Sequence, residues 1–186
     1  MASDVVVQLG DAATAEELFE PICELYDEVF SQPPFVWTDT GSEHHREGLL
    51  SLKDEPSFGI SIATVGGQLI GFAYGFTLPS TTKRWQQFEA PLPRNFVTEE
   101  RGQTFSLIDY AVKDEWRGHG IGRRLLDTLF ASRPEERVTL TVQPTAAETQ
   151  AIYKHWGWQY LGRKVALPGA VSPFWDVYVL PLHAKP

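Results

Sequence analysis

The clearest helical pattern lies near the N-terminus, where apolar side chains recur along one face. The apolar positions are Leu18, Ile22, Leu25, Tyr26 and Val29, a spacing typical of an amphipathic helix. Thr14 and Glu17 form a capping-box pattern at its start. Pro21 falls within the first turns, so the helix either begins later or is bent. A second, shorter helix is predicted over residues 41–55, and Pro56 ends it.

Seven short runs of alternating or continuous apolar residues are typical of β-strands. They cover residues 5–9, 58–65, 68–78, 104–112, 137–142, 158–165 and 172–182. Gly66 and Gly67 separate the second run from the third, and such a pair predicts a tight hairpin turn because both residues can take positive φ. The run 104–112 is apolar almost throughout, which predicts a central strand of the sheet.

Two further helices are predicted between the later strands. One begins near Gly120, and its apolar side is formed by Leu125, Leu126, Leu129 and Phe130. The other begins at Thr145, which forms a second capping-box pattern with Glu148, and it ends at Gly157. This order of elements predicts an α+β fold around one central sheet. Because the chain has neither repeats nor a linker, we expect one domain over residues 1–186.

The composition is that of a globular protein large enough to bury a core without disulfides. The 186 residues are 42% hydrophobic and 22% charged. Cys23 is the only cysteine, so an internal disulfide is impossible, and we expect it to be a small buried residue in a reducing compartment. The N-terminus lacks a signal-peptide pattern, and no apolar run is long enough for a bilayer. We therefore expect a cytoplasmic protein with no membrane partner.

The balance of charge is acidic. There are 16 Lys and Arg against 24 Asp and Glu, which gives a net charge of −8. This charge disfavours binding to a phosphate backbone, so no nucleic-acid partner is expected. It is compatible with a cationic substrate such as an amine.

A glycine-rich turn separates the strand 104–112 from the helix that follows. It contains Gly118, Gly120 and Gly122, and a helix N-terminus behind such a turn is suited to bind phosphate through its free N–H groups. Arg117, Arg123 and Arg124 add positive charge around it. Neither the dinucleotide fingerprint G-x-G-x-x-G nor the P-loop sequence is present. The turn is therefore a candidate phosphate or pyrophosphate site of another kind.

The pattern Arg117-x-x-Gly120-x-Gly122, directly after a strand, resembles the central motif of the GNAT superfamily of acyl-CoA-dependent N-acetyltransferases. The segment "AIYKHWGWQYLG" is similar to a second motif of that family, with Tyr153 and Gly157 in the matching places. The resemblance extends over nearly the full chain through the order of elements. It implies a mixed, mostly antiparallel sheet of about seven strands, flanked by helices and splayed between the fourth and fifth strands.

The resemblance also implies the cofactor site. Acetyl-CoA would be the co-substrate, and no metal would be required. Its pyrophosphate would lie on the backbone of Arg117, Gly118, His119, Gly120, Ile121, Gly122 and Arg123. Its pantetheine arm would pair with the backbone of Tyr110, Ala111 and Val112, like an added strand. The N–H of Val112 would stabilise the oxyanion of the reaction.

Two residues are candidates for proton transfer. The resemblance points the hydroxyl of Tyr153 at the thioester sulfur, as the acid that protonates the leaving thiolate; the alternative is a core tyrosine near Ile152 and Trp156. Asp109 lies on the apolar face of the central strand, which favours either a general base or a structural hydrogen-bond acceptor. The alternatives to Asp109 for removing the substrate proton are a chain of water molecules and carboxylates of the loop 79–103: Glu89, Glu99 and Glu100.

Residues 79–103 have no sustained periodicity, and so long a loop is usually functional or disordered. Its aromatic residues, Trp85, Phe88 and Phe96, either line an acceptor pocket or pack the loop down. The adjacent pair His44 and His45 lacks a metal-binding spacing, and we interpret both as solvated helix surface.

The function expected from these features is transfer of an acetyl group to a primary amine of a small molecule, by direct attack through a tetrahedral intermediate. A protein lysine or N-terminal amine is the alternative acceptor. A CoA-binding sensor of the same fold, without turnover, is the alternative in kind. A homodimer formed by edge pairing of the strand 174–180 also stays open.

Overall fold

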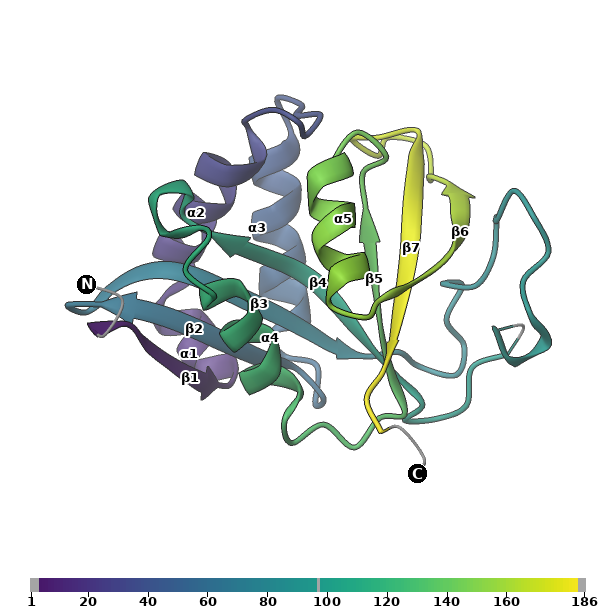
Figure 1. The fold of residues 1–186 in the computed structure, drawn as a ribbon, viewed down its shortest axis with the longest axis horizontal. Helices are drawn as coiled ribbons and strands as arrows, with labels where there is room; N and C mark the ends of the chain where they lie inside the picture. Colours follow the sequence, from purple (N-terminus) through teal and green to yellow (C-terminus); the bar gives the residue numbers. More distant parts are fainter. Residues whose placement is uncertain (1–3, 97, 184–186) are drawn as a thin grey trace. The chain divides into compact units, whose positions relative to one another are not determined.

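The computed structural model describes residues 4–96 and 98–183 of the chain. A seven-stranded mixed sheet runs through it in the order β1-β2-β3-β4-β5-β7-β6, which confirms the predicted fold class (Figure 1). The chain divides into two compact units: unit 1 takes residues up to 32, 37–76 and 107–133, and unit 2 takes residues 33–36, 77–106 and those from 134 onward. A single functional domain over residues 1–186 stays a prediction.

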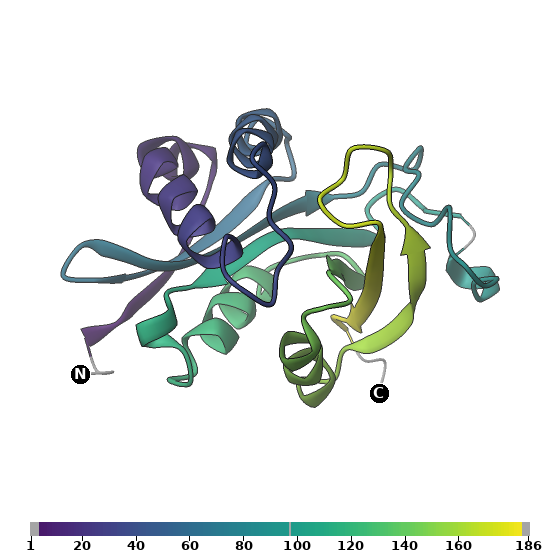
Figure 2. The same cartoon turned by 90° about the horizontal axis from the view of Figure 1, so that it is seen from above.

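Unit 1 is built on antiparallel strands with helices on both faces. The strands are β1 (Val6–Gly10), β2 (Gly59–Val65), β3 (Gln68–Thr77) and the greater part of β4 (Thr104–Val112). In Figures 1 and 2, α2 (Phe19–Phe30) and α3 (Gly41–Leu52) cover one face of these strands, and α4 (Ile121–Phe130) covers the other. The Gly66-Gly67 turn joins β2 to β3 with φ values of 56° and 81°, as predicted.

The predicted first helix is interrupted. The short helix α1 (Ala12–Glu17) is capped by Asp11, whose carboxylate accepts from the Thr14 N–H while the Thr14 side chain reaches back to the Asp11 N–H. Leu18 then separates α1 from α2. The capping box with Thr14 as its first residue is therefore wrong by three positions, because Asp11 already supplies the cap. Pro21 lies in the first turn of α2, where its missing N–H has no intrahelical acceptor anyway.

Unit 2 holds the other half of the sheet. Its strands are β5 (Arg137–Val142), β6 (Gln159–Val165) and β7 (Phe174–Pro181), together with the first residues of β4. Thr104–Ser106 pair in parallel with Arg137–Thr139, and β7 pairs antiparallel with both β5 and β6. The strand β7 lies between β5 and β6, so both of its edges are occupied. The prediction that residues 174–180 form a free edge for dimer pairing is therefore wrong.

The helix α5 (Ala147–His155) follows β5 in unit 2. Its N-cap is Ala146, which makes no side-chain cap bond, so the predicted capping box of Thr145 and Glu148 is wrong. Gly157 ends the helix with a φ of 90°, as predicted, because this left-handed conformation favours glycine. Cys23 of unit 1 is fully buried at 0% exposure, also as predicted.

Candidate active site

The glycine turn (residues 117–123) presents an open helix N-terminus in unit 1. Gly118 and Gly120 have φ values of 76° and 75°, and an added Cβ would meet no atom within 4 Å at either position. Glycine is therefore favoured at both positions by the backbone conformation, since no neighbouring atom would clash with a side chain. The absence of a side chain also lets a ligand come close to the backbone of the turn. Gly120 is the N-cap of α4 and provides no side chain to cap it, so the first N–H groups of α4 have no intrahelical acceptor.

The three arginines of the turn are engaged with the protein itself. Arg117 donates from Nε to the carbonyl of Val112 at 3.1 Å and pairs with Asp114. Arg123 pairs with Asp127 at 2.9 Å, and Arg124 donates to the carbonyl of Val5. The positive potential at the turn therefore comes chiefly from backbone N–H groups and the helix dipole. Arg117 has a further role that its sequence position did not reveal, because it fastens the turn to the end of β4.

Asp109 occupies the predicted face of β4 in unit 1. The buried hydroxyl of Tyr74, on β3, donates a hydrogen bond to its carboxylate. Burial raises the pKa of Asp109 to about 6, and the Tyr74 bond acts in the opposite direction. With a pKa of about 6, the carboxylate is ionised at neutral pH and is basic enough to accept a proton. The Asp109 side chain is also accessible, because 20% of its surface is exposed.

His45 is a member of this cluster that the sequence interpretation missed. Instead of lying on solvated surface it is 6% exposed, and its Nε2 is 3.7 Å from Asp109 Oδ2. Its ring stacks on Tyr26, with centroids 3.7 Å apart. Neither ring nitrogen has a hydrogen-bond partner among the described residues, and burial lowers the pKa of the imidazole to about 3, so it is neutral.

The inward face of α3 explains this correction. Gly41, His45 and Leu49 are its buried residues, four positions apart, so His45 points inward while His44 is exposed as predicted. The four-residue spacing of Gly41, His45 and Leu49 was the only sign of this face in the sequence. It is a weak sign, because only one of the three side chains is clearly apolar. The aromatic neighbours of His45 come from α2 and β3, and the sequence around His45 does not reveal them.

Tyr153 is placed on α5 in unit 2. It is 7% exposed, and its ring packs near Trp158 and Tyr178, with centroid separations of 5.8 and 6.1 Å. No hydrogen bond to its hydroxyl is found among the residues that the structure describes. Burial raises its pKa, so the hydroxyl stays protonated and can donate. The predicted apolar neighbour Ile152 is instead 47% exposed.

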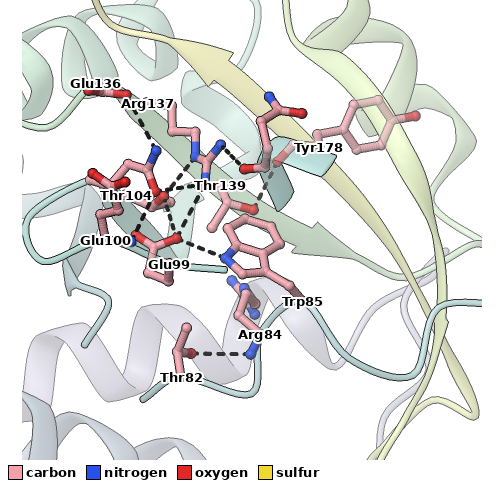
Figure 3. Close-up of polar contacts among 12 residues, drawn as sticks. Thr82, Arg84, Trp85, Glu99, Glu100, Thr104, Glu136, Arg137, Thr139 and Tyr178 are labelled. Carbon is pink, nitrogen blue, oxygen red and sulfur yellow. Dashed lines mark hydrogen bonds and ion pairs between the residues drawn. The ribbon is translucent and has the colours of Figure 1, made fainter. Parts of the chain in front are cut away.

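The long loop 79–103 is anchored to unit 2 by a buried polar network (Figure 3). The indole N–H of Trp85 donates to Glu99 at 2.8 Å, and Arg137 pairs with the same carboxylate at 3.3 Å. The guanidinium of Arg137 also lies over Trp85 and Phe96, 5.2 and 4.3 Å from their centroids. These two aromatic residues therefore pack the loop down, and Glu99 is held in an ion pair, which argues against a role as base.

The network predicts a large loss of stability for Arg137→Met. Removing the cation leaves the Glu99 carboxylate buried without a countercharge, so we expect the free energy of unfolding to fall by about 3–5 kcal/mol. Arg123→Met is the matched control, because Arg123 forms an exposed pair with Asp127 on α4 and its loss costs under ~1 kcal/mol. Urea unfolding followed by tryptophan fluorescence measures both. Equal, small effects would show that the network does not hold the loop.

Comparison with known proteins settles the family. A family model described as the acetyltransferase (GNAT) family matches residues 21–158, which include α2, the glycine turn and Tyr153. The chain belongs to the GNAT acetyltransferase family. None of the curated proteins compared with this GNAT chain matches it significantly.

Solved structures share the fold of this GNAT protein at low sequence identity. The Salmonella typhimurium protein yncA, solved with its cofactor acetyl-CoA, is 15% identical over 98% of this chain and 97% of its own, with a TM-score of 0.63. The ribosomal-protein-S18-alanine N-acetyltransferase of Escherichia coli is 16% identical over 97% of both chains, with a TM-score of 0.61. An aminoglycoside acetyltransferase from an uncultured soil sample is 17% identical, over 82% of this chain and 87% of its own, with a TM-score of 0.53.

None of the helices in the part of the chain that the structure describes combines the length and the hydropathy needed to cross a membrane. Within the same residues, His, Cys, Asp and Glu side chains nowhere gather in a group of three or more that could bind a metal ion.

Proposed function

We propose that this GNAT protein transfers an acetyl group from acetyl-CoA to a primary amine of a small molecule. The observation that carries the proposal is the uncapped N-terminus of α4 at Gly120, reached through a turn where both Gly118 and Gly120 leave open space. Backbone N–H groups of residues 117–123 would bind the pyrophosphate of the co-substrate there. The family motif Arg117-x-x-Gly120-x-Gly122 supports this placement.

The end of β4 would hold the rest of the co-substrate. The backbone of Tyr110, Ala111 and Val112 would pair with the pantetheine amides, and family resemblance predicts that the sheet splays beside these residues. The bond from Arg117 to the Val112 carbonyl supports this role, because it fixes the strand end relative to the glycine turn. The N–H of Val112 would then donate to the oxyanion formed at the thioester carbonyl.

Asp109 is the proposed base. An ammonium substrate must lose one proton before its nitrogen can attack, and the carboxylate is ionised above a pKa of about 6 and able to take that proton. The hydroxyl of Tyr74 holds one carboxylate oxygen in place. The negative charge of the carboxylate also attracts an ammonium group.

Tyr153 is the proposed acid. As the C–N bond forms and the C–S bond breaks, its hydroxyl would give a proton to the departing thiolate sulfur and regain one from solvent. Its protonated state and its freedom from other hydrogen bonds among the described residues support the role.

Tyr153→Phe should lower kcat by more than tenfold, because the ring and its packing remain while the proton donor is lost. The affinity for acetyl-CoA should change less than threefold, since the phosphate site is untouched. Tyr160→Phe is the control, because Tyr160 is an exposed tyrosine on β6 of the same unit. Stopped-flow or steady-state detection of released thiol measures the rate. An unchanged kcat would exclude Tyr153 as the acid.

The acceptor can be tested by thiol release from acetyl-CoA with a panel of small primary amines and of peptides with free N-terminal or lysine amines. Asp109 is 20% exposed and can receive an ammonium group of either class, so turnover with the small amines is the result that supports the proposal. Turnover with peptides alone would support a protein acceptor. Tight acetyl-CoA binding with no turnover across the whole panel would support a sensor.

A further inference from the structure

We infer that Arg84 and Lys164 form a subsite for an oxyanion, a carboxylate or a phosphate, carried by the amine acceptor. This inference rests on the proposed function for the role of its ligand, but the site itself is built from residues of unit 2 alone. Arg84 belongs to the loop 79–103, and Lys164 belongs to β6.

The two cations lie together, and the side chain of one contacts the backbone of the other. Lys164 Nζ donates to the carbonyl oxygen of Arg84 at 2.9 Å. The guanidinium of Arg84 donates from Nη2 to the hydroxyl of Ser106 at 2.8 Å, and its buried Nε has no hydrogen-bond partner among the described residues. Among the residues that the structure describes, no Asp or Glu forms an ion pair with either cation.

This arrangement is unusual for a chain with 24 acidic and 16 basic residues. In the same unit, Arg137 pairs with Glu99 and Arg163 pairs with Asp176. An unpaired, largely desolvated guanidinium costs free energy, which an anion would recover. The electrostatics agree, because burial lowers the pKa of Arg84 to about 10, and burial together with the Arg84 charge lowers that of Lys164 to about 8.

The subsite is rigid and partly open. Phe88 forms a β-bridge with Lys164, and the backbone bonds Glu89 N–H to Arg163 and Val165 N–H to Gln87 extend this pairing along β6. Lys164 also lies over the ring of Phe88, 5.7 Å from its centroid. Arg84 Nε is buried, but both side chains as a whole are half-buried, so each keeps some exposed surface through which a ligand can approach. Preorganised donors lose little side-chain entropy on binding, and the guanidinium fork suits the planar geometry of an oxyanion.

A structural role for the pair is the competing explanation. Lys164 could simply tie the loop to β6 through the Arg84 carbonyl. That bond involves only the backbone of Arg84, so it would remain if the side chain were replaced. Substitution of the Arg84 guanidinium therefore distinguishes the two explanations. If the side chain only packs, its loss changes stability without changing any anion affinity.

The direct test is NMR titration of the purified protein with glutarate and, separately, with inorganic phosphate. We expect saturable shifts at the residues around Arg84, and at least a tenfold weaker Kd in both Arg84→Met and Lys164→Met. Lys154→Met, at an exposed position of α5, is the control and should leave Kd unchanged. Arg84→Lys keeps the charge and should recover part of the affinity, which covers the case in which Arg84→Met folds poorly.

The pattern of binding identifies the anion. Response to glutarate alone assigns a carboxylate, response to phosphate alone assigns a phosphate, and response to both assigns a general oxyanion site. No saturable shift with either probe, or equal affinities in the wild-type protein and both Met variants, overturns the inference.

A kinetic test separates this inference from the proposed function. Pentylamine, δ-aminovalerate and aminopentyl phosphate share an amine and differ in the terminal group. With Arg84→Met we expect KM to rise at least tenfold for the favoured anionic acceptor, with kcat within threefold and pentylamine unaffected. Equal KM values for all three in the wild-type protein would contradict the subsite while leaving acetyl transfer intact. Anion binding without acetylation of any amine would contradict the proposed function instead.

Discussion

Replacing Gly120 with Trp is expected to weaken the binding of acetyl-CoA by more than a hundredfold. The N–H groups at the start of α4 lie behind an open space that a large side chain would fill, since nothing now lies within 4 Å of the position of a Cβ at Gly120. The substitution also places a bulky residue at a φ of 75°, a conformation that residues other than glycine rarely adopt. Isothermal titration calorimetry with acetyl-CoA measures the loss directly.

The chain contains a matched control for this substitution. Gly66 also has a positive φ, of 56°, and a Cβ added there would likewise meet nothing within 4 Å. Gly66→Trp should therefore cause a comparable backbone strain in the β2-β3 hairpin, about 1–2 kcal/mol, without touching the glycine turn. Full affinity in Gly120→Trp, or an equal loss in Gly66→Trp, would mean that the pyrophosphate binds elsewhere.

Features that depend on neighbouring residues in the sequence were predictable. The Gly66-Gly67 hairpin follows from backbone conformations that only glycine adopts easily, and the start of α4 near Gly120 follows from the apolar spacing of the residues after it. The face of β4 that carries Asp109 follows from the alternation of side chains along a strand. Local patterns were enough in each case, because the constraint and the residue that satisfies it are adjacent.

Features that depend on distant segments were not predictable. His45 is buried because α2 and β3 supply Tyr26 and Tyr74 around it, and the sequence near His45 contains no sign of them. Strand β7 is interior because β6 pairs outside it, although it comes last in the chain. Trp85 is buried because Glu99 and Arg137 fold onto it across long sequence separations.

Asp109 shows why these non-local contacts matter for the proposed chemistry. A carboxylate on an exposed strand end would keep an ordinary pKa, and it would be a weak base toward an ammonium group. The aromatic residues and neutral His45 around Asp109 desolvate it and raise its pKa, while the Tyr74 hydroxyl limits the rise. The base strength is therefore set by residues of α2, α3 and β3, and the sequence of β4 alone does not determine it.

Asp109→Asn is expected to lower kcat/KM by about 10²–10⁴, the usual contribution of a general base, while it makes the fold more stable. The wild-type rate should fall below about pH 6 with the protonation of Asp109, and the variant should lose this dependence. The Tyr74 hydroxyl can still donate to the amide oxygen, so the local geometry is kept. Asp127→Asn, at an exposed acid on α4, is the control for both measurements.

The sign of the stability change follows from the raised pKa of Asp109. Its pKa is 3.8 in the unfolded chain and about 6 in the folded protein, so ionisation disfavours the folded state as pH rises between these values. Asparagine avoids that cost, and the free energy of unfolding at pH 8 should rise by up to about 3 kcal/mol. The gain should shrink below pH 6 and vanish near pH 4, where the acid is protonated in both states. Full activity would exclude Asp109 as the base, whereas lost activity with lost stability would instead indicate a structural acceptor.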